Sequence, residues 1–236
     1  MSRKQRTAFI ITFIVLLPLT ISLFIVKGAD LSPLFIYFKT FLSVGFVICS
    51  IIMACIGKIP DKLALFSMFA LISGMLADIF LAIANKVEGI GYIPGALLFL
   101  FQHIMVCIGI LIYSRSNTKR KKLLISMSAT AAGVCLLVFV LVGAVGVALG
   151  TLAIPAAMYA VILAWTFVIP LTGREKTDTR LLMLGIAGIL FFIADLLLIS
   201  GFIENSPRAL SASNLIPYYY AQYLIAFSTG MKANRS

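Results

Sequence analysis

The chain has 236 residues, of which 62% are apolar, and its mean hydropathy is +1.12. Soluble domains are only about half apolar, so this composition excludes a soluble globular protein and indicates a membrane protein with many spanning helices. The net charge of +11 does not indicate nucleic-acid binding, because the basic residues lie in short connectors between apolar runs.

Eight apolar runs follow one another along the chain, and most approach the length of about 20 residues that a helix needs to cross the hydrocarbon core. They cover residues 8–26, 33–56, 63–84, 91–113, 123–142, 147–169, 181–202 and 214–229. Arg3, Lys4 and Arg6 precede the first run as in a signal peptide, but its length and the runs after it favour a retained helix. We therefore predict an all-α membrane protein in which residues 1–236 form one domain, a bundle of eight transmembrane helices.

Basic residues alternate in number from one connector to the next. If the N-terminus is cytoplasmic, the outer connectors hold only Lys27, Lys86 and Arg208, and Lys39 lies within the second run. The other basic residues all fall in segments 3–6, 58–62, 115–122, 174–180 and 232–235. Because cytoplasmic connectors are enriched in Lys and Arg, this distribution predicts a multi-pass protein of the cell membrane with both termini cytoplasmic.

Two aspartates interrupt otherwise uncharged runs, Asp78 in the third and Asp195 in the seventh. A carboxylate at the centre of a spanning helix costs about 2.5–3.5 kcal/mol on insertion scales, so such residues usually have a function. These two runs cross in the same direction, which places both aspartates in the outer half of the membrane. The alternative is that both carboxyl groups are neutral and only hold helices together.

Other polar residues fall near the same depth. Lys39 faces the aspartates or extends to the outer headgroups, and Tyr218 and Tyr219 belong to this layer or to an interfacial aromatic belt. His103 lies somewhat deeper in the membrane. It either takes part in the chemistry or forms a structural hydrogen bond. Gln222 follows the two tyrosines in the eighth run. Gln102 and Gln222 are of the residue type that commonly forms hydrogen bonds between membrane helices.

The residue types exclude several site classes. The chain has one histidine and four scattered cysteines, which exclude a three-histidine or cysteine-cluster zinc site. A metal ion held by Asp78, Asp195 and His103 is a weaker alternative. Cys49, Cys55, Cys107 and Cys135 lie within apolar runs and are predicted to be packing residues without a disulfide framework. No nucleophile elbow and no phosphate-binding loop occurs. Acid–base chemistry by carboxyl groups is what this set of residues supports, and it requires no cofactor or metal.

Several segments together resemble the lysoplasmalogenase-like, YhhN-type family of membrane proteins. They extend from the third run to the eighth, and their order and spacing carry the resemblance. The segments are Leu71-Ile-Ser-Gly-Met-Leu-Ala-Asp78-Ile-Phe-Leu81, Pro94-Gly-Ala-Leu-Leu-Phe-Leu-Phe-Gln-His103, Pro155-Ala-Ala-Met-Tyr159, Leu184-Gly-Ile-Ala-Gly-Ile-Leu-Phe-Phe-Ile-Ala-Asp195 and Tyr218-Tyr-Tyr-Ala-Gln222.

The chain departs from the family pattern at four positions. Ala77 and Ala194 precede the two aspartates, where the family usually has glycine and serine. Val106 stands where a tyrosine is common, and Thr40 replaces the proline that commonly follows the lysine of the second helix. These departures leave the predicted fold unchanged. They weaken the inference from the family to this chain's own substrate and activity.

The resemblance implies hydrolysis of the vinyl-ether bond of lysoplasmalogens, which yields a fatty aldehyde and a glycerophospho-alcohol. Asp78 and Asp195 are then the catalytic pair, facing each other across a cavity that lipid can reach, and His103 orients a carboxyl or transfers a proton. The substrate-binding candidates are Lys39, Tyr159, Tyr218, Tyr219 and Gln222. The expected partners are a lysophospholipid substrate and membrane lipids, with no obligate protein partner. Two other hypotheses are a proton-coupled transporter of lipids or small solutes and a non-catalytic lipid-binding protein.

Overall fold

The structure, a computed structural model, describes residues 3–29, 32–57, 61–84, 93–114, 120–144, 153–173, 178–200 and 208–231. Within these residues every regular element is a helix, which confirms the predicted all-helical class. The helices are α1 (Arg3–Gly28), α2 (Ser32–Gly57), α3 (Lys62–Ala84), α4 (Ile93–Ser114), α5 (Arg120–Ala144), α6 (Ala153–Gly173), α7 (Thr179–Ser200), α8 (Arg208–Ala212) and α9 (Leu215–Ser228).

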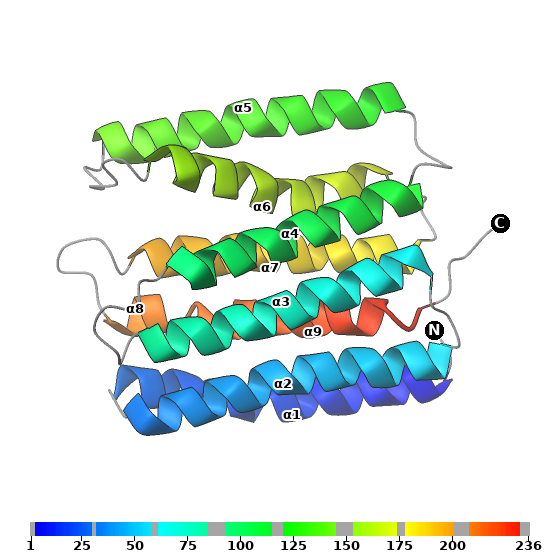
Figure 1. Cartoon of the computed structure of the whole chain (residues 1–236), viewed down its shortest axis with the longest axis vertical. Coiled ribbons are helices and arrows are strands. Elements are labelled where there is room, and N and C mark those ends of the chain that lie inside the picture. The colour runs from blue at the N-terminus through cyan, green and yellow to red at the C-terminus, as the bar shows by residue number, and fades with distance from the viewer. Residues whose placement is uncertain are drawn as a thin grey trace.

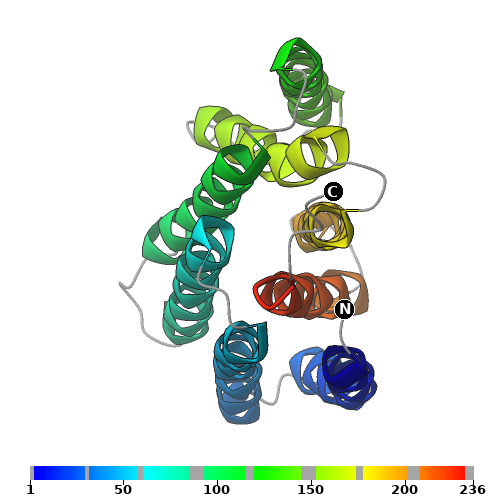
Figure 2. The same ribbon diagram turned by 90° about the vertical axis from the view of Figure 1, so that its right-hand side faces the viewer.

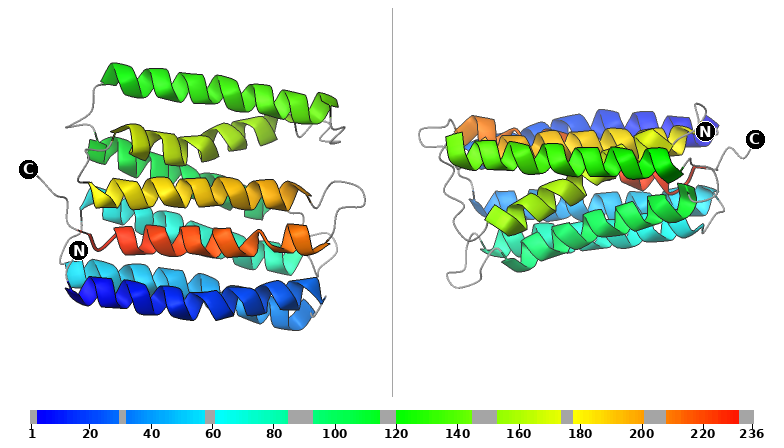
Figure 3. Two further views of the ribbon diagram at one scale, coloured as in Figure 1. Left: turned by 180° about the vertical axis from the view of Figure 1, so that it is seen from behind. Right: turned by 90° about the horizontal axis from the view of Figure 1, so that it is seen from above.

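The helices lie side by side along one direction (Figure 1). Seen along their axes in Figure 2, α2, α3 and α4 form one row, and α1, α9 and α7 form a second row opposite to it. Helix α6 contacts α4 and α7 and so joins the two rows at one side, and α5 lies outside α6. Both rows are also visible from above in Figure 3.

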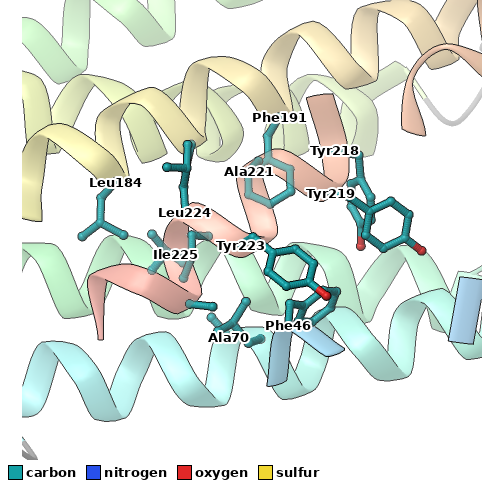
Figure 4. Packing of buried hydrophobic residues seen from close by; sticks show 14 of the residues in the cluster. Phe46, Ala70, Leu184, Phe191, Tyr218, Tyr219, Ala221, Tyr223, Leu224 and Ile225 are labelled. Carbon is teal, nitrogen blue, oxygen red and sulfur yellow. The ribbon is translucent and has the colours of Figure 1, made fainter. Parts of the chain in front are cut away.

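Helix α9 lies at the centre of the bundle. Although it has only 14 residues, its buried residues include every position from Ala221 to Ser228. It packs against α1, α2, α3 and α7, and its side chains form the middle of the hydrophobic cluster shown in Figure 4. A helix so short and so enclosed serves mainly to supply side chains to the interior.

Two helices begin at the same end of the bundle with aspartate caps. Asp61 Oδ1 accepts a hydrogen bond from the backbone N–H of Ala64, and Asp178 Oδ1 accepts one from Leu181. Each carboxylate satisfies an N–H that the first helical turn leaves without a partner. Arg180, 1% exposed, forms a bidentate ion pair with Asp61 and so ties the start of α7 to the start of α3.

Five helices of the described chain are long and apolar enough to cross a membrane, over Gln5–Gly28, Leu34–Gly57, Lys62–Ile83, Ile93–Tyr113 and Thr179–Leu198. Lys122–Leu137 and Ala157–Thr172 are shorter apolar helical segments. Large apolar side chains also cover the outside of the bundle, as Ile14 and Phe41 do at 66% and 65% exposure. A lipid environment accommodates such a surface, so the protein is a membrane protein.

The predicted runs agree with the observed helices to within a few residues where both are described. The residues before Ala153 that the sixth predicted run includes lie outside the described residues, as do the last two of the seventh. The eighth predicted run is α9, preceded by the short α8, which the sequence did not predict.

Candidate functional site

Asp78 of α3 lies at the centre of a polar cluster between α2, α3 and α9. The Lys39 ammonium is 3.0 Å from Oδ1. The hydroxyl groups of Ser43 and Tyr218 donate to Oδ2 over 2.6 and 2.8 Å. Lys39 and Ser43 are four residues apart on α2 and therefore lie on one helix face. Both oxygens of Asp78 are thus occupied by donors.

These partners satisfy the hydrogen-bonding capacity of the buried Asp78 carboxyl group. A carboxylate that is 1% exposed is stable when a cation and hydrogen-bond donors compensate its lost hydration, and three donors meet that need here. Lys39 therefore faces the aspartate and does not extend to the headgroups, which decides between the two interpretations of this lysine. Its side chain is 11% exposed, against 1% for Asp78, so it is the more accessible member of the ion pair.

The side-chain amides of Gln222 and Gln102 form a hydrogen-bonded network that positions the Tyr218 hydroxyl. Gln222 Nε2 donates to the Tyr218 hydroxyl over 2.8 Å, and Gln222 exchanges hydrogen bonds of 2.9 and 3.2 Å with Gln102 of α4. Gly74 of α3 makes room for this exchange, because a Cβ there would collide with the Gln102 amide. The predicted role of the two glutamines, hydrogen bonding between helices, is confirmed.

Tyr219 completes the Asp78 cluster. It is fully buried, its hydroxyl donates to the Lys39 carbonyl over 3.2 Å, and it lies 3.3 Å from the Ser43 hydroxyl. Tyr218 is 8% exposed. Both tyrosines are therefore interior residues of the bundle, and neither is part of an interfacial belt.

Asp195 of α7 has different surroundings. The Tyr159 hydroxyl, from α6, donates to Asp195 Oδ2 over 2.7 Å, and the same hydroxyl oxygen lies 3.4 Å from His103 Nε2 of α4. Within the described residues Asp195 forms no ion pair, and its Oδ1 has no hydrogen-bond partner. Asp195 is half-buried. This carboxyl group is consequently the more open of the two, and it lacks a neutralising cation.

Aromatic rings connect the two clusters. The ring of Phe191, one turn before Asp195, makes edge contacts with His103 at 5.1 Å and with Tyr218 at 5.7 Å between centroids. Phe99 of α4 contacts Tyr218 in the same way at 5.7 Å. In Figure 4 Phe191 and Tyr218 lie on neighbouring helices of the buried cluster. These ring contacts form an aromatic wall that runs from Tyr218, whose hydroxyl donates to Asp78, through Phe191 to His103.

The hydrogen bonds and the ion pair divide the other predicted site residues between the two aspartates. Lys39, Tyr218, Tyr219 and Gln222 gather around Asp78, whereas Tyr159 and His103 gather around Asp195. No residue of the described chain hydrogen-bonds to both aspartates.

Sequence reasoning did not identify Ser43, Gly74 or Phe191. Ser43 has a usable signal in its spacing of four from Lys39, and Phe191 has the same spacing from Asp195. Gly74 lies inside a segment that carries the family resemblance, but its spatial role depends on Gln102, which lies on another helix.

No group of three His, Cys, Asp or Glu side chains in the described residues is arranged to hold a metal ion. The four cysteines are free, and Cys107 is buried. The polar side-chain groups of the two clusters are carboxyl, hydroxyl, phenol, imidazole, amide and ammonium groups.

Comparison with known proteins gives one match. The family model described as the YhhN family matches residues 34–229, from near the start of α2 to the residue after α9. Every residue of both clusters lies inside the matched range. No curated protein and no solved structure matches the chain.

Proposed function

Because the chain belongs to the YhhN family, we propose that it is a membrane-embedded hydrolase of the lysoplasmalogenase type. Its substrate would be a lysophospholipid with a vinyl-ether chain, and its products a fatty aldehyde and a glycerophospho-alcohol. The observation that carries this proposal is the open carboxyl group of Asp195, which is held by Tyr159 and lies beside His103.

Hydrolysis of a vinyl ether begins with a proton. Transfer of this proton to the carbon β to the ether oxygen produces an oxocarbenium ion, which water then attacks. The acid must keep its proton near neutral pH and reach the substrate. We assign this role to Asp195, because it has no cation partner in the described chain and its Oδ1 forms no hydrogen bond there.

Asp78 has a different role in this proposal. With its oxygens occupied by Lys39, Ser43 and Tyr218, it fixes the positions of those partners. An ammonium group has three hydrogens, so Lys39 can contact both Asp78 and a phosphate oxygen of the head group. Tyr218 and Tyr219 hold this end of the site in place, with Gln222 behind them.

Topology forms part of the proposal. The bundle would cross the cell membrane eight times as one domain, with α8 and α9 together making the eighth crossing and both termini in the cytoplasm. The start of α1 lies beside the end of α9, where the Gln5 amide donates to the Gly230 carbonyl over 2.6 Å. Ends that lie together support an even number of crossings.

The experiment measures aldehyde release by purified protein from a vinyl-ether lysophospholipid, with the ester and saturated-ether analogues as substrate controls. We expect Asp195→Asn to lower turnover by about 10²–10⁴-fold, the usual contribution of a general acid. Asp178→Asn is a matched control, because it makes the same change on the first turn of the same helix and asparagine also caps helices.

Wild-type protein that releases no aldehyde would contradict the hydrolase proposal. Near-wild-type turnover by a folded Asp195→Asn variant would contradict the assignment of the acid. A proton-coupled transporter would instead show lipid or solute flux in proteoliposomes that depends on a pH gradient.

A further inference from the structure

Three side chains from three helices form a hydrogen-bonded series beside the aromatic wall. Asp195 of α7 accepts from the Tyr159 hydroxyl at 2.7 Å, and the Tyr159 oxygen lies 3.4 Å from His103 Nε2. The rings of His103 and Tyr159 meet edge to face, 5.7 Å between centroids. Since Phe191 packs on the same imidazole at 5.1 Å, the orientation of His103 is fixed by its neighbours.

The direction of these hydrogen bonds sets the tautomer of His103. A phenol has one hydrogen, and that of Tyr159 points to Asp195. The Tyr159 oxygen is therefore an acceptor for the imidazole, so the proton of a neutral His103 lies on Nε2. The other ring nitrogen, Nδ1, then carries a lone pair and can only accept a hydrogen bond.

Nδ1 of His103 has no hydrogen-bond partner among the described residues, although His103 is only 2% exposed. Buried polar atoms in native proteins are almost always hydrogen-bonded, and an exception calls for a water molecule, a ligand or a catalytic role. Nδ1 is thus an oriented acceptor without a protein partner in the described chain, on the ring whose other nitrogen contacts the Tyr159 oxygen that donates to Asp195.

We infer that His103 Nδ1 binds and deprotonates the water that attacks the substrate, and that Tyr159 is the positioning residue that keeps this nitrogen unprotonated. The inference rests on the proposed hydrolase function. It assigns the second half of the reaction to His103, and it moves Tyr159 from substrate binding to positioning.

The steps balance without a further reactant. Asp195 gives its proton to the β carbon, and the carbon–carbon double bond becomes a single bond as the oxocarbenium ion forms. Water adds its oxygen to the cationic carbon and gives one proton to His103 Nδ1, which yields a hemiacetal. The hemiacetal hydroxyl then returns a proton to Asp195 while His103 protonates the departing alkoxide oxygen. The carbon–oxygen bond breaks, aldehyde and alcohol leave, and both side chains regain their starting protonation.

Deuterium incorporation from D₂O distinguishes the two halves of this reaction, protonation of the vinyl carbon and attack by water. In D₂O the wild-type protein should release aldehyde with one deuterium next to the carbonyl carbon, and the unreacted lysolipid should gain none. Without the water-activating base, the cation should return its proton or deuteron to Asp195. The unreacted lysolipid would then gain deuterium at the vinyl carbon while aldehyde release falls.

The main variant is His103→Phe, which keeps an aromatic ring in the contacts with Phe191 and Tyr159. We expect aldehyde release to fall by about 10²–10⁴-fold, with deuterium in the recovered lysolipid by mass spectrometry. Tyr159→Phe is the second variant, and we expect a smaller fall in kcat than for His103→Phe, little change in KM, and measurable deuterium uptake. Asp195→Asn should show neither product nor uptake, and Asp178→Asn should behave as wild type.

Loss of aldehyde without deuterium uptake in both folded variants would overturn the inference, because His103 would then act at or before protonation. Unchanged turnover by His103→Phe would also overturn it. If His103→Phe does not give a folded protein, as judged by size-exclusion chromatography and thermal unfolding, the deuterium result for Tyr159→Phe decides. Failure of the hydrolase proposal can be told apart from failure of this inference, because the wild-type protein would then release no aldehyde.

Discussion

Partners distinguish the two aspartates, which look equivalent in the sequence. Asp78 is enclosed by an ammonium and two hydroxyl groups, whereas Asp195 has one phenol and an open oxygen. A carboxyl group whose oxygens both accept from fixed donors is suited to positioning those donors. A carboxyl group with one oxygen that has no hydrogen-bond partner is suited to proton transfer. The proposed roles, Asp195 as the acid and Asp78 as the counter-ion of Lys39, rest on this difference.

Removing Lys39 should destabilise the protein strongly. Lys39→Met leaves the Asp78 carboxylate buried without its cation, and breaking a buried ion pair in this way costs about 3–5 kcal/mol of unfolding free energy. We expect the double variant with Asp78→Asn to recover part of that loss, because no charge is then left unpaired. Thermal unfolding in detergent measures both effects.

Lys62→Met provides the control, because Lys62 is exposed at the start of α3. A surface change of this kind is worth about 0.5 kcal/mol or less. A Lys39→Met protein as stable as this control would mean that the Lys39–Asp78 ion pair contributes little to stability.

The sequence allowed part of the site to be predicted at this scale. Depth along each helix follows from residue number and crossing direction, so Lys39, Asp78 and the tyrosines were correctly placed in one group. Rotation about each helix axis does not follow, because these helices are apolar on nearly every face and lack a polar stripe that indicates the buried side. The division of the polar partners between Asp78 and Asp195 depends on that rotation and could not be predicted.

Helix ends on one side of the bundle are joined by a buried ion pair. Arg180 has a side chain with 0% exposure, and it pairs with Asp61, whose side chain is 29% exposed. The guanidinium group also lies over the ring of Tyr113 at the end of α4, 5.5 Å from its centroid. One arginine thereby links α3, α4 and α7, the helices that carry Asp78, His103 and Asp195.

The two partners of this ion pair should differ in their effect on stability. Asp61→Ala removes the cap of α3 and leaves a fully buried guanidinium unpaired, so we expect a loss of about 3–5 kcal/mol. Arg180→Met leaves a partly exposed carboxylate that water can reach, so its loss should be smaller, at about 1–3 kcal/mol. Thermal unfolding of the two variants under the same conditions gives the order, and the reverse order would contradict this account of the pair.

Element boundaries were easier to predict than packing. Lys62 and Arg180 mark the starts of α3 and α7, because charged residues stay near the ends of apolar runs. Helix α8 was missed, since five residues of mixed polarity give no periodic signal. The central position of α9 was also missed, because its sequence is no more apolar than that of helices on the outside.

At the scale of the whole molecule, composition alone indicated the membrane, and the apolar exterior of the bundle agrees with it. The predicted orientation in the membrane rests on the basic connectors, which contribute most of the charge of +11. The two clusters lie toward the end of the bundle opposite the Arg180–Asp61 ion pair, because Asp78 and Asp195 are near the ends of α3 and α7 and that pair is at their starts. The site would therefore open toward the outer leaflet.

Fusion proteins test this orientation. We expect green fluorescent protein attached at the C-terminus to fluoresce and alkaline phosphatase attached there to be inactive, because the C-terminus should lie in the cytoplasm. Alkaline phosphatase inserted after Lys86 should be active, since this connector should lie outside. The opposite pattern would reverse the membrane side of the site.

The enclosed position of α9 has a consequence for biosynthesis. This helix follows in the chain all the helices that surround it, and it brings Tyr218 and Gln222. The earlier helices therefore leave the ribosome before the side chains that fill the space between them. Assembly of the polar interior requires α9 to insert among helices that were synthesised before it.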